Sequence, residues 1–238
     1  FGIDWQCLKD TINAQTRLII VNFPHNPTGA ILSAADLEQL AEIVRDTNCL
    51  LLSDEVYEHI VFDGESHRSL LSHDELWERT LVVASFGKTF HATGWKLGYC
   101  ITPEPLTVEF RKVHQFTTFA VSTPMQHGVA DFLVSDPDFY ADLPAFYQQK
   151  RDHFCGLLEG SRFRFKPTPS TFFQILDYGE ISDDKDLALA KQWTREIGVA
   201  SIPLSVFCET PFTGTRLRFC FAKDDATLEE AARRLCAL

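Results

Sequence analysis

Residues 81–99 read LVVASFGKTFHATGWKLGY, and this stretch does most to decide the fold. Its first four residues are apolar and rich in β-branched side chains, which is typical of a buried strand. A polar loop with two lysines, Lys88 and Lys96, is predicted after the strand. Lys88 lies among small and aromatic residues, and a lysine in such surroundings loses hydration, so that its amine can become a nucleophile toward a carbonyl. We therefore predict that Lys88 forms a Schiff base with an aldehyde cofactor.

Strands and helices alternate through the first part of the chain. Short apolar runs predict strands over residues 17–22, 49–52, 81–84 and 97–101. Between the first two strands, Ser33 and Asp36 have the spacing of a capping box at the start of a helix. Residues 4–15 are expected to form the end of a helix or a loop. The alternation predicts an α/β architecture with a largely parallel sheet.

The pattern changes after Pro103, where three helices are followed by a second, smaller α/β pattern. The helices are expected over residues 104–119, 123–135 and 138–160, the last of which is long enough to link two domains. Beyond it, we expect strands over 171–176, 199–202 and 216–221, with helices over 185–197 and from about 227. These patterns predict a large domain over residues 1–145 and a small C-terminal domain over residues 146–238.

Composition excludes several classes of function. The chain has 238 residues with a formal net charge of −11 and no long basic run, so we expect no nucleic-acid partner. No apolar run is long enough to cross a bilayer, so we expect no membrane partner. The seven cysteines form no Cys-x-x-Cys pair and lie mostly in apolar runs, which predicts buried, reduced thiols in a cytoplasmic protein. No histidine has metal-ligand spacing, so no metal site is expected.

Polar residues follow each of the first three predicted strands. Ligands of a parallel α/β sheet bind beyond the carboxyl ends of its strands. If these strands are neighbours, one pocket holds an amide, a carboxylate, a phenol, a hydroxyl and a lysine. The residues concerned are Asn26, Asp54, Tyr57, Ser85 and Lys88.

Five ordered motifs point to a family. They are Asn-Pro-Thr-Gly at 26–29, Asp54-x-x-Tyr57, Ser85-x-x-Lys88, Gly94-Trp95-Lys96-x-Gly98 and Arg-Phe-Cys-Phe-Ala-Lys at 218–223. Together they resemble the class I, fold type I pyridoxal-phosphate-dependent aminotransferases, most closely the branch of methionine and kynurenine aminotransferases. The resemblance covers nearly the whole chain. It implies part of a large domain with a mainly parallel sheet, then a small α/β domain, as the C-terminal portion of such an enzyme.

The resemblance implies a catalytic group of three residues. Lys88 would form the internal aldimine with pyridoxal 5'-phosphate and move a proton between the substrate Cα and the cofactor. Asp54 would pair with the pyridine nitrogen and keep the ring protonated, which makes it an electron sink. Tyr57 would bond the cofactor's phenolic oxygen together with Asn26, and Asn26 would also contact the substrate.

The resemblance also implies residues that bind two anions, the cofactor phosphate and the substrate carboxylate. Ser85 and Lys96 would hold the cofactor phosphate, with Lys96 acting as a point charge. Arg218 would bind the substrate α-carboxylate and orient the Cα–H bond for proton loss. Arg216 shares a strand face with Arg218 by the period of two, so strand geometry alone does not choose between them. The resemblance favours Arg218.

The implied reaction is transamination between a methionine-like or aromatic L-amino acid and a 2-oxo acid acceptor, in a homodimer. Two alternatives stay open. One is a carbon–sulfur β-lyase acting on cysteine conjugates through the same proton removal by Lys88. The other is a truncated, non-catalytic fragment, because nothing before Asn26 supplies the ring-stacking aromatic and phosphate-binding amides of the family. For the same reason we expect this stretch alone to bind the cofactor weakly or not at all.

Overall fold

A computed structural model describes residues 1–210 and 212–238, and the chain divides into two compact units. The first unit comprises Phe1–Pro24, Ile31–Val61 and Glu65–Leu143. The second comprises His25–Ala30, Phe62–Gly64 and Pro144–Leu238. Two short segments therefore belong to the second unit although their neighbours in sequence belong to the first. The domain limits drawn from the sequence, 1–145 and 146–238, stay a prediction.

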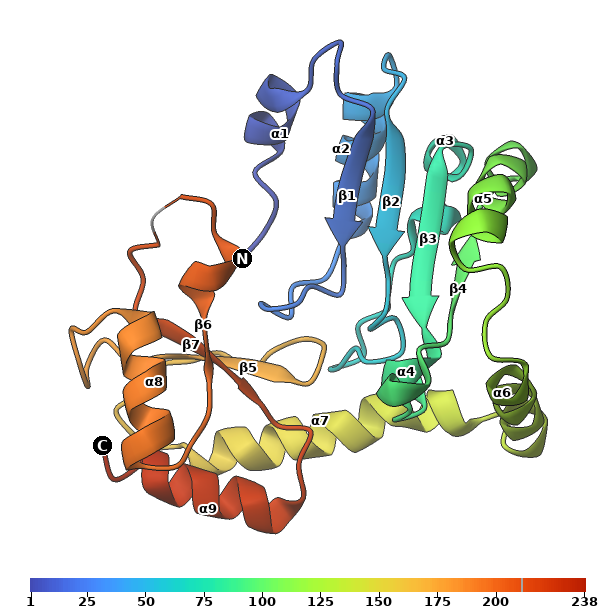
Figure 1. The fold of residues 1–238 in the computed structure, drawn as a ribbon. Helices are drawn as coiled ribbons and strands as arrows, with labels where there is room; N and C mark the ends of the chain where they lie inside the picture. The colour runs from blue at the N-terminus through green and yellow to red at the C-terminus, as the bar shows by residue number, and fades with distance from the viewer. Residues whose placement is uncertain (211) are drawn as a thin grey trace. The chain divides into compact units, whose positions relative to one another are not determined.

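A four-stranded sheet forms the centre of the first unit, in the order β1-β2-β3-β4 (Figure 1). β1 (Leu18–Asn22), β2 (Leu50–Asp54) and β3 (Thr80–Ser85) are parallel, whereas β4 (Gly98–Ile101) pairs antiparallel with β3. A parallel return needs a crossover, usually a helix. The connection from β3 to β4 contains only single-turn helices, so the chain returns antiparallel. The predicted α/β class is thus confirmed, with one antiparallel edge strand.

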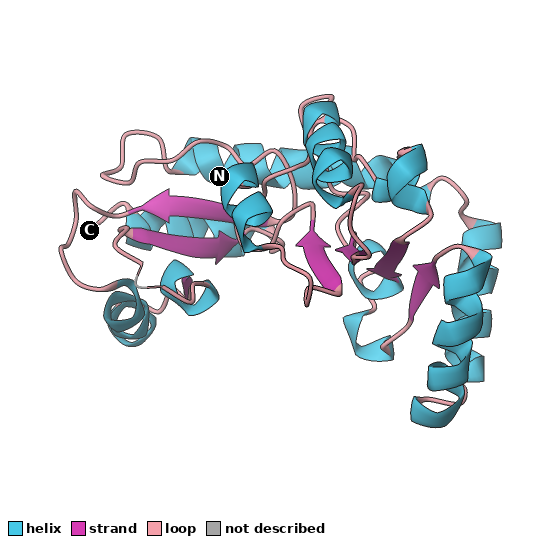
Figure 2. Ribbon diagram, turned by 90° about the horizontal axis from the view of Figure 1, so that it is seen from above, coloured by secondary structure: helices cyan, strands magenta, loops and turns pink. Residues whose placement is uncertain are grey.

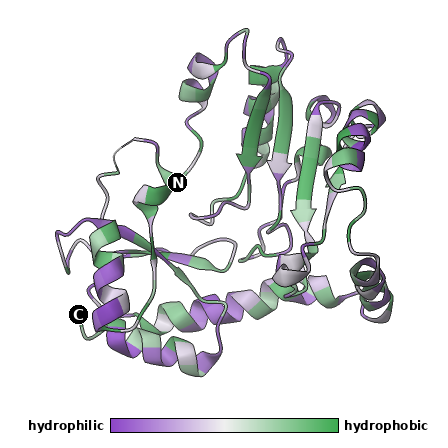
Figure 3. Cartoon of the chain, viewed as in Figure 1, coloured by the Kyte–Doolittle hydropathy of each residue, from purple (hydrophilic) through white to green (hydrophobic). Residues whose placement is uncertain are grey.

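The core of the first unit lies between the sheet and α2 (Ala34–Val44). The predicted capping box is present, because the Asp36 backbone N–H donates to the Ser33 hydroxyl and the Asp36 carboxylate accepts from the Ser33 N–H at 2.7 Å. The strands are apolar along most of their length (Figure 3). The buried side chains of α2 pack with those of β1 and β2, namely Leu37, Leu40, Ala41 and Val44 with Val21 and Leu51.

Further helices complete the first unit. They are α1 (Trp5–Thr11), η1 (Leu70–Ser72), α3 (Asp74–Trp77), α4 (Phe86–Thr89), η2 (Thr93–Trp95), α5 (Glu104–Thr117) and α6 (Thr123–Ser135). One expectation was wrong: Lys88 lies in helix α4 and not in a loop. The helix forms because Ser85, the last residue of β3, caps its first turn.

The second unit contains most of α7 (Phe139–Leu157) and an antiparallel sheet in the order β5-β7-β6. Figure 2 shows β5 (Phe173–Asp177) and β7 (Arg216–Cys220) as arrows that run in opposite directions. α8 (Asp186–Glu196), η3 (Leu204–Phe207) and α9 (Asp225–Leu235) complete it. The strand predicted over 199–202 is displaced to β6 (Ile202–Pro203). Proline has no N–H to donate, which limits this edge strand to two residues.

The cysteines depart from the prediction. None forms a disulfide, but only Cys49 and Cys155 are buried, and four of the seven are exposed. An apolar run does not reveal which of its faces is covered, and Cys220 stands at the exposed end of β7. In the described part of the chain, no helix has the length and apolar character needed to cross a bilayer.

Candidate active site

Asp54 ends β2 and lies in register with Asn22, the last residue of β1. The Asn22 side-chain amide donates to Asp54 Oδ2 at 3.1 Å, and the Val56 N–H donates to Oδ1 at 3.2 Å. Each carboxylate oxygen can accept more than one hydrogen bond. Asp54 is therefore oriented by two donors and keeps acceptor capacity for a ligand.

Tyr57 lies in the turn that follows β2, with only 3% of its surface exposed. The next residue, Glu58, accepts a hydrogen bond from the Tyr99 hydroxyl on β4. Burial and this hydrogen bond raise the pKa of Tyr99, so its hydroxyl stays protonated and remains a donor. The turn that carries Tyr57 is thus tied to the strand that follows the lysine-containing segment.

Ser85 and Lys88 stand at the carboxyl end of β3. The Ser85 hydroxyl accepts from the Gly87 N–H at 3.0 Å and donates to the Leu97 carbonyl at 3.2 Å. Lys88 follows within α4 and is half-buried. The single hydroxyl proton of Ser85 is used by Leu97, so donation to a phosphate requires rotation away from that carbonyl.

Lys96 has a left-handed backbone conformation, with φ of 56°, at the end of η2. A positive φ is uncommon outside glycine, and such strained positions cluster at functional sites. The side chain is exposed, unlike that of Lys88. The two lysines of the segment therefore occupy different environments, which suits different roles.

In the second unit, Arg218 on β7 is hydrogen-bonded to Asn26. One guanidinium N–H donates to Asn26 Oδ1. The guanidinium carbon also lies 4.0 Å from the ring centroid of Phe173 and 5.5 Å from that of Phe207. The planar fork of donors of an arginine matches the geometry of a carboxylate, and the guanidinium also stacks on aromatic faces. The amide and the guanidinium that the sequence predicted for substrate binding are thus brought together.

Arg216 lies on the same face of β7 but has a different partner. Its Nε is 3.5 Å from Asp177 Oδ2 on the neighbouring strand β5, and its side chain is 43% exposed. An ion pair of this kind at the surface is structural and weak. The contacts therefore distinguish the two arginines that strand periodicity left equivalent.

The sequence-predicted residues divide between the two units. Asp54, Tyr57, Ser85, Lys88 and Lys96 belong to the first unit, and Asn26 and Arg218 to the second. Asn22 was not predicted as a site residue. The available indication was its place as the last polar residue of a strand that runs parallel to the strand of Asp54. Among the described residues, no group of three or more His, Cys, Asp or Glu side chains could hold a metal ion.

Comparisons with known proteins identify the family of the chain. The family described as aminotransferase class I and II matches residues 1–235. The chain is 46% identical to methionine aminotransferase of Escherichia coli over 235 residues, which is 99% of this chain and 61% of that protein. It is 36% identical to kynurenine–oxoglutarate transaminase of Dictyostelium discoideum over 262 residues, covering 98% of this chain and 60% of that protein.

The structural comparison gives the same result. A crystal structure from Escherichia coli, described as that of a protein with methionine aminotransferase function, superposes with a TM-score of 0.96 at 46% identity. The match covers all of this chain and 63% of that one. The chain thus spans about 60% of the length of these relatives. Its architecture is that of the fold type I aminotransferases, and the chain belongs to the class I and II aminotransferase family.

Proposed function

We propose that the protein carrying this chain is a pyridoxal-phosphate-dependent aminotransferase. The observation that carries the proposal is the carboxyl edge of the first sheet. There, Asp54 ends β2 and Lys88 follows β3 by less than one helical turn, in a chain that matches the family over nearly its full length. The amino-group donor is a methionine-like or aromatic L-amino acid and the acceptor is a 2-oxo acid. The names of the relatives support this substrate class.

The residues of the first unit fit this cofactor by their chemistry. A pyridine nitrogen needs an oriented carboxylate, and Asp54 is held by the Asn22 amide and a backbone N–H. An aldehyde needs a primary amine, which Lys88 supplies. A phosphate needs positive charge and donors, which Lys96 and Ser85 supply once the Ser85 hydroxyl turns from Leu97. When bound, pyridoxal phosphate supplies the electron sink that stabilises negative charge developing at the substrate Cα.

Three residues of the first unit have separate roles in the proposed reaction. The Lys88 amine takes up the proton from the substrate Cα as a general base. The protonated amine then gives a proton back as a general acid. Asp54 holds its acceptor oxygens in a fixed direction because two N–H donors orient it. Tyr57, which is buried, presents its phenol as a hydrogen-bond donor from a turn tied to β4.

Arg218 and Asn26 bind the substrate α-carboxylate in this proposal. The Arg218 fork is pre-oriented by Phe173 and by its hydrogen bond to the Asn26 carbonyl oxygen. Holding the carboxylate restricts rotation about the Cα bonds and so orients the Cα–H bond for proton removal. The same pair serves the 2-oxo acid, since it carries the same carboxylate.

Two lysines eight residues apart allow a sharp test. The full-length gene product is incubated with pyridoxal phosphate, reduced with borohydride and digested, and the peptides are analysed by mass spectrometry. We expect the reduced pyridoxyl group on Lys88 and not on Lys96. Lys88→Ala abolishes both the labelling and amino-group transfer from methionine to a 2-oxo acid, whereas Lys96→Ala keeps the label and weakens cofactor binding. A label confined to Lys96, or transfer that survives in Lys88→Ala, contradicts the proposal.

The same preparation tests the β-lyase alternative that the sequence left open. A cysteine conjugate supplied without a 2-oxo acid releases pyruvate only if β-elimination occurs, and we expect this to be slow relative to transfer. The proposal includes a homodimer, which rests on the resemblance, and a cytoplasmic location, which rests on the composition of the chain. Light scattering of the purified protein tests the assembly, and fractionation of the source cells tests the location.

A further inference from the structure

The segment that carries Asn26 is a closed loop. The Gly29 N–H donates to the His25 carbonyl at 2.7 Å, and the His25 N–H donates to the Ala30 carbonyl at 2.8 Å. Residues 25–30 belong to the second unit, although β1 and α2 on either side belong to the first. Whatever holds this loop to the second unit therefore also sets the position of Asn26 against Arg218.

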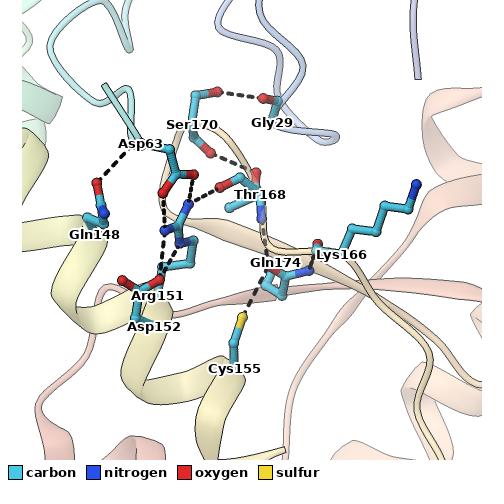
Figure 4. A network of polar contacts seen from close by, with 10 residues as sticks. All are labelled: Gly29, Asp63, Gln148, Arg151, Asp152, Cys155, Lys166, Thr168, Ser170 and Gln174. Carbon is cyan, nitrogen blue, oxygen red and sulfur yellow. Dashed lines mark hydrogen bonds and ion pairs between the residues drawn. The ribbon is translucent and has the colours of Figure 1, made fainter. Parts of the chain in front are cut away.

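Ser170 makes that attachment. Its hydroxyl donates to the Gly29 carbonyl at 2.7 Å, and the residue has no exposed surface (Figure 4). Gly29 has φ of +71°, and a Cβ there would overlap the Thr168 hydroxyl. The loop thus approaches residues 168–170 as closely as a glycine permits, and one buried hydrogen bond fixes it there.

The segment that contains Ser170 is itself rigidly held. Arg151, 3% exposed, donates to the Thr168 carbonyl at 2.9 Å and is paired with Asp63 at 2.6 Å. The Gln174 side chain accepts from the Thr168 N–H at 3.0 Å (Figure 4). A buried polar network whose members are all satisfied specifies a single arrangement. Ser170 therefore holds the loop against a fixed support and not against a mobile one.

The same segment also supports Arg218. Phe173 lies three residues after Ser170, and its ring centroid is 4.0 Å from the Arg218 guanidinium carbon. Ile175, two residues further on, pairs with Arg218 across β5 and β7. Residues 168–175 therefore contact both halves of the pair. They hold the loop of Asn26 at Gly29, and they contact Arg218 through Phe173.

We infer that Ser170 is a positioning residue for recognition of the substrate carboxylate: its hydroxyl holds Gly29, and through the closed loop it keeps Asn26 beside Arg218. Ser170 acts through Asn26 and does not itself touch the substrate. The inference rests on the proposed function, because it assigns the purpose of the Asn26–Arg218 pair. Loss of the Ser170 hydroxyl weakens discrimination for the carboxylate and leaves the chemistry of the amine unaffected.

The test compares methionine with 3-(methylsulfanyl)propylamine, the same molecule without its carboxylate. Single-turnover rates with the full-length protein loaded with pyridoxal phosphate give kcat/KM for both. We expect Ser170→Ala to lower the ratio of the two values about tenfold, as loss of one hydrogen bond to a binding group would. KM for methionine and for the 2-oxo acid rises, with little change in kcat. Ser170→Cys keeps a weak donor at this position, so it shows a smaller fall.

Thr80→Val is the matched control, because Thr80 is also fully buried and donates a 2.6 Å hydrogen bond to a backbone carbonyl, that of Leu76 in the first unit. A general loss of stability lowers kcat/KM for both substrates equally and leaves the ratio of the two values unchanged. An unchanged ratio in Ser170→Ala, in an active wild-type background, overturns the inference alone. A wild type that transfers no amino group from methionine overturns the proposed function and this inference together.

Discussion

Asn22 and Asp54 occupy one register position at the ends of two neighbouring parallel strands, and the Asn22 amide donates to the Asp54 carboxylate at 3.1 Å. The other Asp54 oxygen accepts from the backbone N–H of Val56 at 3.2 Å. Asn22 therefore supplies the side-chain support of the carboxylate on which the proposed cofactor chemistry depends.

Asn22→Ala removes that support. The loss of a hydrogen bond to a charged group costs about 1.5 kcal/mol, so we expect the single-turnover rate with methionine to fall about tenfold. Asn13→Ala, in an exposed loop of the same unit, serves as the control. Equal rates in the two variants would mean that Asn22 does not support Asp54 during the reaction.

The two arginines of β7 are predicted to differ strongly. Arg218→Lys loses the planar fork and its contact with Phe173, so we expect KM for both substrates to rise at least tenfold. Arg216→Lys keeps a surface ion pair with Asp177 and should change KM by less than about twofold. Steady-state kinetics of both variants decide the matter. A larger effect at Arg216 would reverse the assignment of the carboxylate ligand.

Gly29 and Gly64 form a second matched pair. Both have positive φ, but a Cβ at Gly29 would overlap Thr168 whereas one at Gly64 would meet nothing within 4 Å. Gly64→Ala should therefore cost only the left-handed conformation, about 1–2 kcal/mol. Gly29→Ala should cost distinctly more, because residues 168–170 must also move. Urea denaturation midpoints measure the difference, and identical midpoints would show that the loop adapts without strain.

The Asp63–Arg151 pair predicts a pH dependence of stability. The hydrogen bond from Arg151 holds the pKa of Asp63 below its ordinary value of 3.8. A lowered folded-state pKa gives stability that is present above the unfolded value and is lost as the pH falls through the folded one. Asp63→Asn should therefore destabilise the protein by about 1–2 kcal/mol near neutral pH. The substitution removes a charge partner of the buried Arg151, and the half-exposed position of Asp63 limits the size of the loss.

The measurement is the melting temperature between pH 6 and pH 2. We expect the wild type to lose its advantage over Asp63→Asn progressively below about pH 3.8. Melting curves that stay a constant distance apart over this range would show that the carboxylate does not carry the effect.

Much of the architecture was accessible from the sequence because local patterns determine it. The strand before Lys88, the capping box at Ser33 and the helix over 123–135 follow from short-range apolar spacing and turn chemistry. The short helix at Lys88 was missed because its four residues are too few to show a helical period. Strand direction was missed at β4 because it depends on the length of a connection and not on the strand itself.

In the candidate site, too, local sequence patterns did not reveal long-range contacts. The resemblance placed Asp54, Lys88 and Arg218 in named roles. Strand geometry alone did not distinguish Arg218 from Arg216. That distinction depends on long-range partners, Asn26 for one and Asp177 for the other. The roles of Asn22 and Ser170 were not predicted for a related reason, because each residue acts through a hydrogen bond to a residue distant in sequence.

The loop at 25–30 has a consequence for protein engineering. An exchange of specificity between two relatives would ordinarily join the N-terminal part of one to residues 144–238 of the other. Such a chimera would combine Arg218 and Ser170 from one parent with Asn26 and Gly29 from the other, although these residues form one contact set. A functional exchange should therefore graft residues 25–30 and 62–64 along with the C-terminal part, as three pieces of a single inherited module.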